Sequence, residues 1–191
     1  MKNLEIYIHI PFCVRKCEYC DFLSFPADDD AKLRYVKGLM AEMIFYGPLM
    51  KNYQVSSVYI GGGTPSSIDE QWTAALMEGV FDCFNVLPDA EISIECNPGT
   101  LSREKLLAYR DAGINRLSIG LQSANNDELK LLGRIHTFEQ FVTNYEVARN
   151  VGFKNINVDL MYGLPGQSAS QYMATVNKII RLHPDHISAY S

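Results

Sequence analysis

Short apolar runs rich in β-branched residues alternate along this chain with longer stretches of helical periodicity. The short runs predict six strands. They lie at residues 4–10, 55–61, 91–96, 116–121, 155–161 and 186–190. Between them, apolar residues recur every three to four positions, which predicts amphipathic helices.

Three of the predicted helices carry a continuous apolar stripe. The stripes consist of Leu33, Val36, Met40 and Met43, of Phe138, Phe141, Val142, Tyr145 and Ala148, and of Tyr172, Val176, Ile179 and Ile180. Residues with capping chemistry mark several boundaries. Ser102 can cap a helix that ends near Gly113, Gly152 closes another, and Pro184 follows the last.

The strict alternation of strand and helix predicts the arrangement of the strands. It implies parallel strands joined by right-handed crossovers. Two architectures fit, a doubly wound sheet and part of a (β/α) barrel. In both of them the functional groups collect at the carboxyl ends of the strands, so candidate site residues are expected there.

Composition narrows the class of protein. The 191 residues are 47% hydrophobic and 20% charged, with 17 basic and 22 acidic side chains and a formal charge of −5. This balance is typical of a globular domain and argues against a nucleic-acid partner, because no basic excess is available for phosphates. No apolar run approaches the roughly 18–20 residues that cross a bilayer, and Glu5 and His9 interrupt the first one. We therefore expect a cytoplasmic location.

Cys13, Cys17 and Cys20 follow the first predicted strand with the spacing C-x3-C-x2-C. Three thiolates in one short loop can converge on a soft metal centre, either zinc or an iron–sulfur cluster. A structural zinc needs a fourth ligand, for which His9 is the nearest candidate. A [4Fe–4S] cluster on three thiolates leaves one iron open for another ligand. The pattern favours the cluster over zinc and over three unliganded thiols.

The cysteine pattern at the end of a first strand resembles the signature of the radical S-adenosylmethionine (SAM) enzymes. The longer string YIHIPFCVRKCEYCDF at 7–22 resembles the oxygen-independent coproporphyrinogen III oxidase family and its heme-chaperone branch. Further matching blocks are GGGTPS at 61–66, ECNP at 95–98, SIGLQ at 118–122, GRIHT at 133–137 and DLMYGLP at 159–165. They follow the order of the family over nearly the whole chain.

The resemblance implies a partial, open (β/α) barrel of about five βα units and a final strand. On this basis residues 1–191 are expected to form a radical SAM core that is truncated at its C-terminal end, with a C-terminal domain outside this chain. The implied cofactors are a [4Fe–4S] cluster and SAM, with heme as a further ligand. The implied chemistry is reductive cleavage of SAM to methionine and a 5′-deoxyadenosyl radical.

Several residues are candidate contacts for SAM. The glycine-rich turn after the second strand lets the backbone approach a ligand closely, and the resemblance places Gly62, Gly63 and Thr64 at the cofactor. A phosphate loop is the rival interpretation, but no Lys-Ser/Thr pair follows the glycines. Tyr7 matches a family position beside the cofactor, although an aromatic residue on a first strand is also typical of a core.

Polar residues end the next three strands. Glu95, Gln122 and Asp159 lie at or near strand ends, where a buried carboxylate needs partners. The resemblance implies that they contact the ribose and methionine parts of SAM. It also implies that Arg134 meets the carboxylate of the cofactor, which suits a guanidinium fork. Cys96 lies beside Glu95 and could line the site without a ligand role.

Two departures from the oxidase pattern bear on function. The oxidase branch has a further cysteine two positions after the third ligand, where this chain has Phe22, and a long extension precedes its cluster. Both features favour the heme-chaperone branch, whose role is heme binding and delivery. The alternative is a genuine oxidase that converts propionates of coproporphyrinogen III to vinyl groups, and a zinc-stabilised binding domain is more remote. The implied partners are a porphyrin or heme, an electron donor such as flavodoxin or ferredoxin, and a membrane surface or heme acceptor met through the missing part.

Overall fold

Six parallel strands form one curved sheet in the computed structural model, which describes residues 2–191. The strands are β1 (Lys2–Ile10), β2 (Tyr53–Gly62), β3 (Val86–Cys96), β4 (Arg116–Gln122), β5 (Asn155–Met161) and β6 (His186–Tyr190). The helices are α1 (Asp29–Tyr46), α2 (Glu70–Cys83), α3 (Arg103–Asp111), α4 (Asn126–Leu131), α5 (Phe138–Asn150) and α6 (Ala169–Ile180). Three short 3₁₀ turns are η1 (Gly47–Met50), η2 (Pro65–Ser67) and η3 (Pro98–Thr100). All six predicted strands are confirmed.

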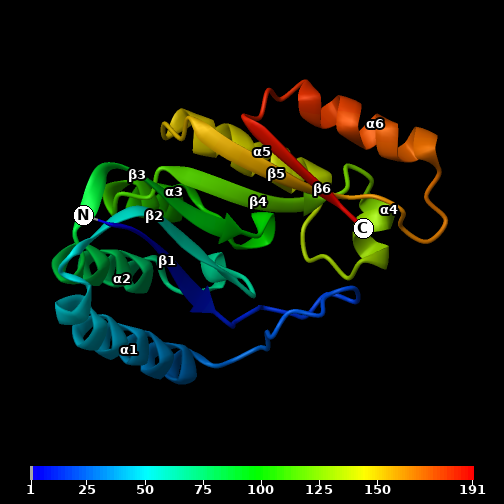
Figure 1. Ribbon diagram of the computed structural model, residues 1–191. Helices are drawn as coiled ribbons and strands as arrows, with labels where there is room; N and C mark the ends of the chain where they lie inside the picture. Colours follow the sequence, from blue (N-terminus) through cyan, green and yellow to red (C-terminus); the bar gives the residue numbers. More distant parts are fainter. Residues whose placement is uncertain (1) are drawn as a thin grey trace.

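The order of the strands decides between the two architectures that alternation allows. Neighbouring strands pair in the order β1-β2-β3-β4-β5-β6, and every pair is parallel. A doubly wound sheet reverses direction at a switch point, whereas a sequential order with crossovers of one hand keeps the helices on one face. Helix α1 contacts α2, α2 contacts α3 and α3 contacts α5, as expected for an outer layer. The prediction of a partial, open (β/α) barrel is confirmed (Figure 1).

Short polar side chains begin the helices. The Ser102 hydroxyl accepts a hydrogen bond from the Lys105 backbone N–H at 3.1 Å, as its position predicted. Thr137 and Ser168 form complete capping boxes at the starts of α5 and α6. Glycine at φ +101 follows the end of α5 at position 152, as predicted. No helix within residues 2–191 has both the length and the apolar character that a membrane span requires.

Alternate residues of each strand face the helices and build the main core. These positions are apolar in every strand, and they include Ile8, Ile10, Val58, Ile60, Ile92, Ile94, Leu117, Ile119, Ile156 and Val158. They are almost completely buried against the apolar stripes of the helices. Burial of aliphatic side chains contributes about 1.5–3 kcal/mol for each, so this layer supplies most of the stabilisation of the fold.

The other residues of the same strands face the inside of the barrel and are mostly polar. They include Tyr7, His9, Tyr59, Ser93, Glu95, Arg116, Ser118, Asn157, Asp159, His186 and Ser188. Hydrogen bonds join them across neighbouring strands, for example from the Asn157 amide to the Ser118 hydroxyl at 2.8 Å. The interior of a typical (β/α) barrel is filled by branched apolar side chains. We call the side of the sheet that these polar residues line the inner chamber, and its polarity suits a polar ligand.

Candidate cofactor site

The three predicted cysteine ligands lie in the loop between β1 and α1, on the side toward which the strands point (Figure 1). The Cys13 N–H donates to the Phe25 carbonyl at 3.1 Å, and the Phe25 N–H donates to the Pro11 carbonyl at 3.0 Å. These bonds pin the beginning of the loop to its end. Cys13 is buried, Cys17 and Cys20 are half-buried, and all three are free thiols.

The middle of the cysteine loop docks on the turn between α4 and α5. The Glu18 N–H donates to the Leu132 carbonyl at 3.2 Å. Beside it, the Tyr19 ring packs on a small apolar cluster of Leu132, Met161 and Leu164. The loop therefore touches elements from both halves of the sheet, and this contact brings it over the inner chamber.

The donor set of the loop fits an iron–sulfur cluster. Three free thiols in one short segment are the ligands that such clusters use. Within residues 2–191 no three His, Cys, Asp or Glu side chains converge closely enough to hold a metal ion. Ligation by Cys13, Cys17 and Cys20 therefore stays a prediction. His9, the candidate fourth ligand for zinc, shares a hydrogen bond of 3.1 Å with the Tyr7 hydroxyl through Nδ1, and its Nε2 is buried without a partner among residues 2–191.

The glycine turn after β2 lies directly against the first cysteine. A Cβ atom at Gly63 would stand 3.1 Å from the Cys13 sulfur and 2.8 Å from the Phe12 carbonyl oxygen, so only glycine fits without a shift. The Thr64 hydroxyl lies 3.4 Å from the Cys13 sulfur. Gly62 has φ +123, a conformation that L side chains rarely adopt. The predicted residues of this turn are thus brought to the cysteine loop.

Glu95 connects the glycine turn to the inner wall. Its carboxylate accepts hydrogen bonds from the Gly62 N–H at 3.0 Å and from the Tyr59 hydroxyl at 2.8 Å. Burial raises the pKa of Glu95 above its usual range, although both hydrogen bonds oppose the shift. A buried carboxylate of this kind is a good partner for a cationic or hydroxylated ligand.

Tyr7 is not a core residue. Its ring stacks on the Tyr59 ring with centroids 6.2 Å apart, and 59% of the residue is exposed. Partial burial and the nearby Glu95 carboxylate raise the pKa of Tyr7. The structure therefore places Tyr7 on the inner wall beside Glu95, in accord with a position at the cofactor.

Gln122 ends β4 in an unusual backbone conformation. The pairing register of β4 with β5 shifts between Gly120 and Gln122, and Gln122 has φ +76. Its side chain is buried and turns back over the strand, where its oxygen accepts a hydrogen bond from the Tyr190 hydroxyl at 2.6 Å. A bulge at a strand end is a common way to re-aim a functional side chain.

Arg134 joins the cysteine loop to the second half of the sheet. One terminal nitrogen lies 3.6 Å from the Cys17 sulfur and 3.3 Å from the Tyr19 hydroxyl, and the other donates to the Gly120 carbonyl at 2.6 Å. Its Nε is buried and has no hydrogen-bond partner among residues 2–191. A buried donor without a partner is costly, so this guanidinium is poised for an acceptor that a ligand can supply.

Asp159 lies deeper on the inner wall. It pairs in register with Gly120 and accepts hydrogen bonds from the Ser118 hydroxyl at 3.1 Å and the Asn157 amide at 2.7 Å. Burial raises its pKa, and these two hydrogen bonds oppose the shift. Glu95, Gln122 and Asp159 therefore face inward, and each has a hydrogen-bond partner.

The expectation that Cys96 could line the site is wrong. Cys96 is buried on the helix-facing side of β3, where its thiol donates to the Ile94 carbonyl at 3.8 Å. Burial raises the pKa of this thiol far above the ordinary value. Because residues of a strand alternate in direction, Glu95 and Cys96 necessarily point to opposite faces.

Sequence reasoning missed several residues of the site. Tyr59 and Tyr190 hold Glu95 and Gln122 respectively. His136 is buried and bonds the Asn97 side chain and the Leu121 carbonyl, so it supports the ends of β3 and β4. Burial, with a smaller effect of the Arg134 charge, lowers the pKa of His136 to about 3. Alternation along the strands could have found the two tyrosines, since both share the inward parity.

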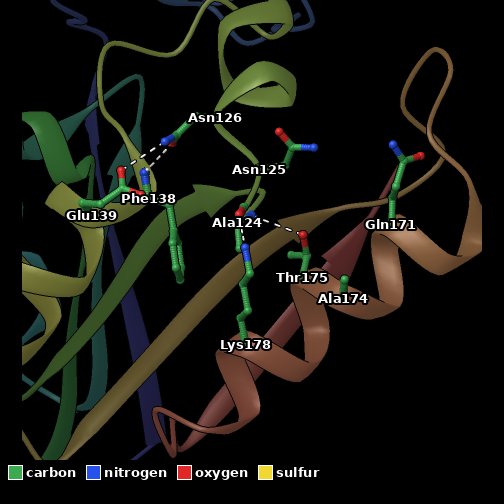
Figure 2. Close-up of a pocket in the computed structure, with 9 residues that line it drawn as sticks. All are labelled: Ala124, Asn125, Asn126, Phe138, Glu139, Gln171, Ala174, Thr175 and Lys178. Carbon is green, nitrogen blue, oxygen red and sulfur yellow. Dashed lines mark hydrogen bonds between the residues drawn. The ribbon is translucent and has the colours of Figure 1, made fainter.

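One small pocket lies away from this chamber. It measures about 280 Å³ and opens between the starts of α4 and α5 and the length of α6 (Figure 2). Lys178 and Thr175 reach from α6 to the backbone of Ala124 there. None of the residues that line this pocket belongs to the cysteine loop.

A family comparison agrees with this geometry. The family model described as the Radical SAM superfamily matches residues 7–179, which include the end of β1, the cysteine loop and all of β2 to β5. The chain therefore belongs to the radical SAM superfamily, and membership implies a [4Fe–4S] cluster and SAM.

Particular relatives narrow the resemblance. The chain is 39% identical over 193 residues to the heme chaperone HemW of Escherichia coli (strain K12), covering 98% of this chain and 50% of that protein. It is also 39% identical over 186 residues to HemW of Bacillus subtilis (strain 168), covering 97% and 49%. Among solved structures it is similar to coproporphyrinogen III oxidase (HemN) from Escherichia coli, with a TM-score of 0.93, 33% identity and coverage of 99% and 44%. The predicted resemblance to the heme-chaperone branch is confirmed, and the chain spans about half the length of the curated relatives it matches.

Proposed function

We propose that this chain holds a [4Fe–4S] cluster and SAM in its barrel as the core of a heme-chaperone-type protein. Cys13, Cys17 and Cys20 are the cluster ligands. The observation that carries the proposal is Arg134, whose guanidinium spans from the Cys17 sulfur to the Gly120 carbonyl with one buried donor left over. It lies where the cysteine loop meets the polar wall.

The residues for SAM fall into two groups on the inner wall. The first group presents backbone groups and a carboxylate, and its Gly63 and Thr64 lie against Cys13. Its members are Tyr7, Gly62, Gly63, Thr64 and Glu95. The second group presents an amide, a guanidinium and a second carboxylate, and its Arg134 reaches the Cys17 sulfur. Its members are Gln122, Arg134 and Asp159. Together they complement the charges of a ligand with an ammonium, a carboxylate and ribose hydroxyls.

The bound cofactors supply reductive cleavage of the sulfonium S–C bond, which the protein alone cannot perform. The chain contributes binding and shielding. The Glu95 carboxylate and the backbone of the glycine turn orient a cationic amine, and Arg134 orients a carboxylate. The packed core between the strands and the helices shields the inner chamber from water on the helix-facing side of the sheet.

Heme binding is supported by the exposed surface of the cysteine loop. Phe22 and Leu23 are 70% and 78% exposed, and Val14 and Phe25 add further apolar surface. Arg15 is on the same loop. Apolar side chains beside cations suit a flat porphyrin that carries carboxylates, and exposed apolar patches mark binding sites more often than chance.

The first experiment tests the cofactors. Anaerobic reconstitution with iron and sulfide is expected to give a brown chain with a cluster signal in electron paramagnetic resonance, and SAM is expected to change that signal. The same experiment distinguishes an iron–sulfur cluster from zinc, because a colourless chain that holds one zinc and no iron overturns the proposal.

A second experiment tests heme. Ferric heme titrated into the chain is expected to give a saturable absorption band, weakened by Phe22→Ser combined with Leu23→Ser. Phe45→Ser is the matched control, because Phe45 is 67% exposed but lies on α1. Equal affinity in both variants contradicts a heme surface on this loop.

A coproporphyrinogen III oxidase is the second candidate, favoured by the structural match to HemN. The distinguishing assay incubates the reconstituted chain with coproporphyrinogen III, SAM and a reductant. Formation of protoporphyrinogen supports the oxidase, whereas stable heme binding without turnover supports the chaperone.

A further inference from the structure

Gln122 holds a backbone conformation that its side chain disfavours. Its φ of +76 lies in the left-handed region, where a residue with a Cβ atom is uncommon. Among residues 2–191 the one other non-glycine residue with positive φ is His183, which lies in the turn before β6. Conformations of this kind persist where the surroundings enforce them, and they gather at functional sites.

The conformation determines where the Gln122 amide lies. A Cβ atom at Gly120 would stand 3.0 Å from the Gln122 amide nitrogen and 3.4 Å from the Arg134 guanidinium. The amide is therefore folded over Gly120, on the inner wall and next to Arg134. With an ordinary extended backbone after the bulge, the side chain would leave this position.

The residues that follow Gln122 are fixed by two helices. The Ser123 hydroxyl is completely buried and donates to the Glu128 carboxylate on α4. The Ala124 N–H donates to the Thr175 hydroxyl at 3.2 Å, and the Lys178 ammonium donates to the Ala124 carbonyl at 2.9 Å, both from α6 (Figure 2). The segment is thus bound from both sides immediately after the left-handed residue.

Glu128 is the centre of this arrangement. It is 8% exposed, and one carboxylate oxygen accepts from Ser123 and from the Gln167 amide at 3.0 Å. The other oxygen is buried without a partner in the described part of the chain. A buried carboxylate oxygen without a partner is costly, but removing the side chain would leave the buried Ser123 hydroxyl without its acceptor. The partnered carboxylate oxygen of Glu128 is a strong, directional acceptor for the Ser123 hydroxyl.

We propose that Glu128 and Thr175 are positioning residues that hold Gln122 in its left-handed conformation and so present its amide to SAM. Glu128 acts through the Ser123 hydroxyl, and Thr175 acts through the Ala124 backbone N–H. The inference rests on the proposed function in one respect, that Gln122 is a SAM contact. Its structural half, the enforcement of the backbone at Gln122, stands on the geometry alone.

The first test needs no cofactor. In the chain without cluster, Glu128→Ala is expected to lower the melting temperature, and the loss is expected to be clearly smaller in a Gln122→Gly background. Glycine adopts the left-handed conformation without strain, so less enforcement is needed there. Glu146→Ala on the exposed face of α5 is the matched control and should act equally in both backgrounds. Equal losses for Glu128→Ala in both backgrounds overturn the proposal.

The second test measures SAM affinity of the reconstituted chain. Glu128→Ala and Thr175→Val are each expected to weaken SAM binding roughly tenfold while iron and sulfide content stay unchanged, and Glu128→Gln should restore part of it. In the Gln122→Gly background Glu128→Ala should weaken binding no further, because coupled residues are not additive. Additive effects overturn the positioning role. If the unmodified chain binds no SAM, the proposed function fails. The thermal test still decides whether Glu128 enforces the backbone conformation of Gln122.

Discussion

Replacement of Gly63 by alanine adds one methyl group at the point where the glycine turn meets the cysteine loop. The added carbon would stand 2.8 Å from the Phe12 carbonyl oxygen, 3.0 Å from the Ser24 Cβ and 3.1 Å from the Cys13 sulfur. Two of these neighbours are backbone or close to it, so they cannot swing away. The turn and the loop must separate.

The size of the effect follows from the contacts. Overpacking by one methyl group in a tight site costs about 1–3 kcal/mol. Gly63 does not have a positive φ, so no additional backbone strain is expected. The Gly63 N–H, which donates to the Ile10 carbonyl at 2.9 Å, ties the turn to the end of β1 and limits its retreat. The cysteine loop therefore moves, and with it Cys13.

The assay compares Gly63→Ala with Gly38→Ala. Gly38 lies within α1, and a Cβ atom there meets nothing within 4 Å. Alanine at that helical position should stabilise the chain by up to about 1 kcal/mol. Urea unfolding of the cluster-free chain and iron content after reconstitution are measured for both. Gly63→Ala should lose stability and bind several-fold less iron; full iron content at unchanged stability would refute the reasoning.

Three further substitutions test other parts of the site. Cys17→Ser is expected to abolish the cluster while the circular dichroism spectrum stays unchanged. The control Cys83→Ser, at the end of α2, should leave the cluster intact. Global unfolding of Cys17→Ser would contradict the expectation that the cysteine loop is not needed for folding. Arg134→Lys should weaken SAM binding about tenfold, because a lysine cannot reach both Cys17 and Gly120; an unchanged titration speaks against the bridge. The pKa of His136 is about 3 in the folded chain and about 6.5 in the unfolded chain. Between these values only the unfolded chain binds the proton, so the free energy of unfolding falls by up to about 1.4 kcal/mol for each pH unit below 6.5. His136→Gln should remove that part of the pH dependence.

The order of elements was predictable because each strand and helix carries its own local signal. The apolar stripes and the Ser102 cap define the elements without reference to distant residues. Alternation alone leaves a doubly wound sheet and a barrel both possible. The distinction depends on which strands pair, for instance β3 with β4, and pairing partners leave no local pattern.

The candidate site was predictable to the extent that a family pattern names its residues. Side-chain direction decides the remaining positions, as Cys96 and Tyr59 show, because alternation along a strand determines which residues face the inner chamber. The left-handed backbone at Gln122 has no signal of its own in the sequence, since glutamine rarely adopts it. It arises from Glu128 and Thr175, which contact the segment only after folding.

The two faces of each strand have different tasks, and this division has a consequence for how the barrel can be altered. Cohesion depends on one set of alternate residues, such as Ile94, and ligand choice depends on the other set, such as Glu95. Substitutions on the inner wall can therefore re-specify what the chamber accepts while the cohesion of the barrel stays with the opposite face. Ligand specificity and folding are therefore separable properties that depend on adjacent residues of the same strands.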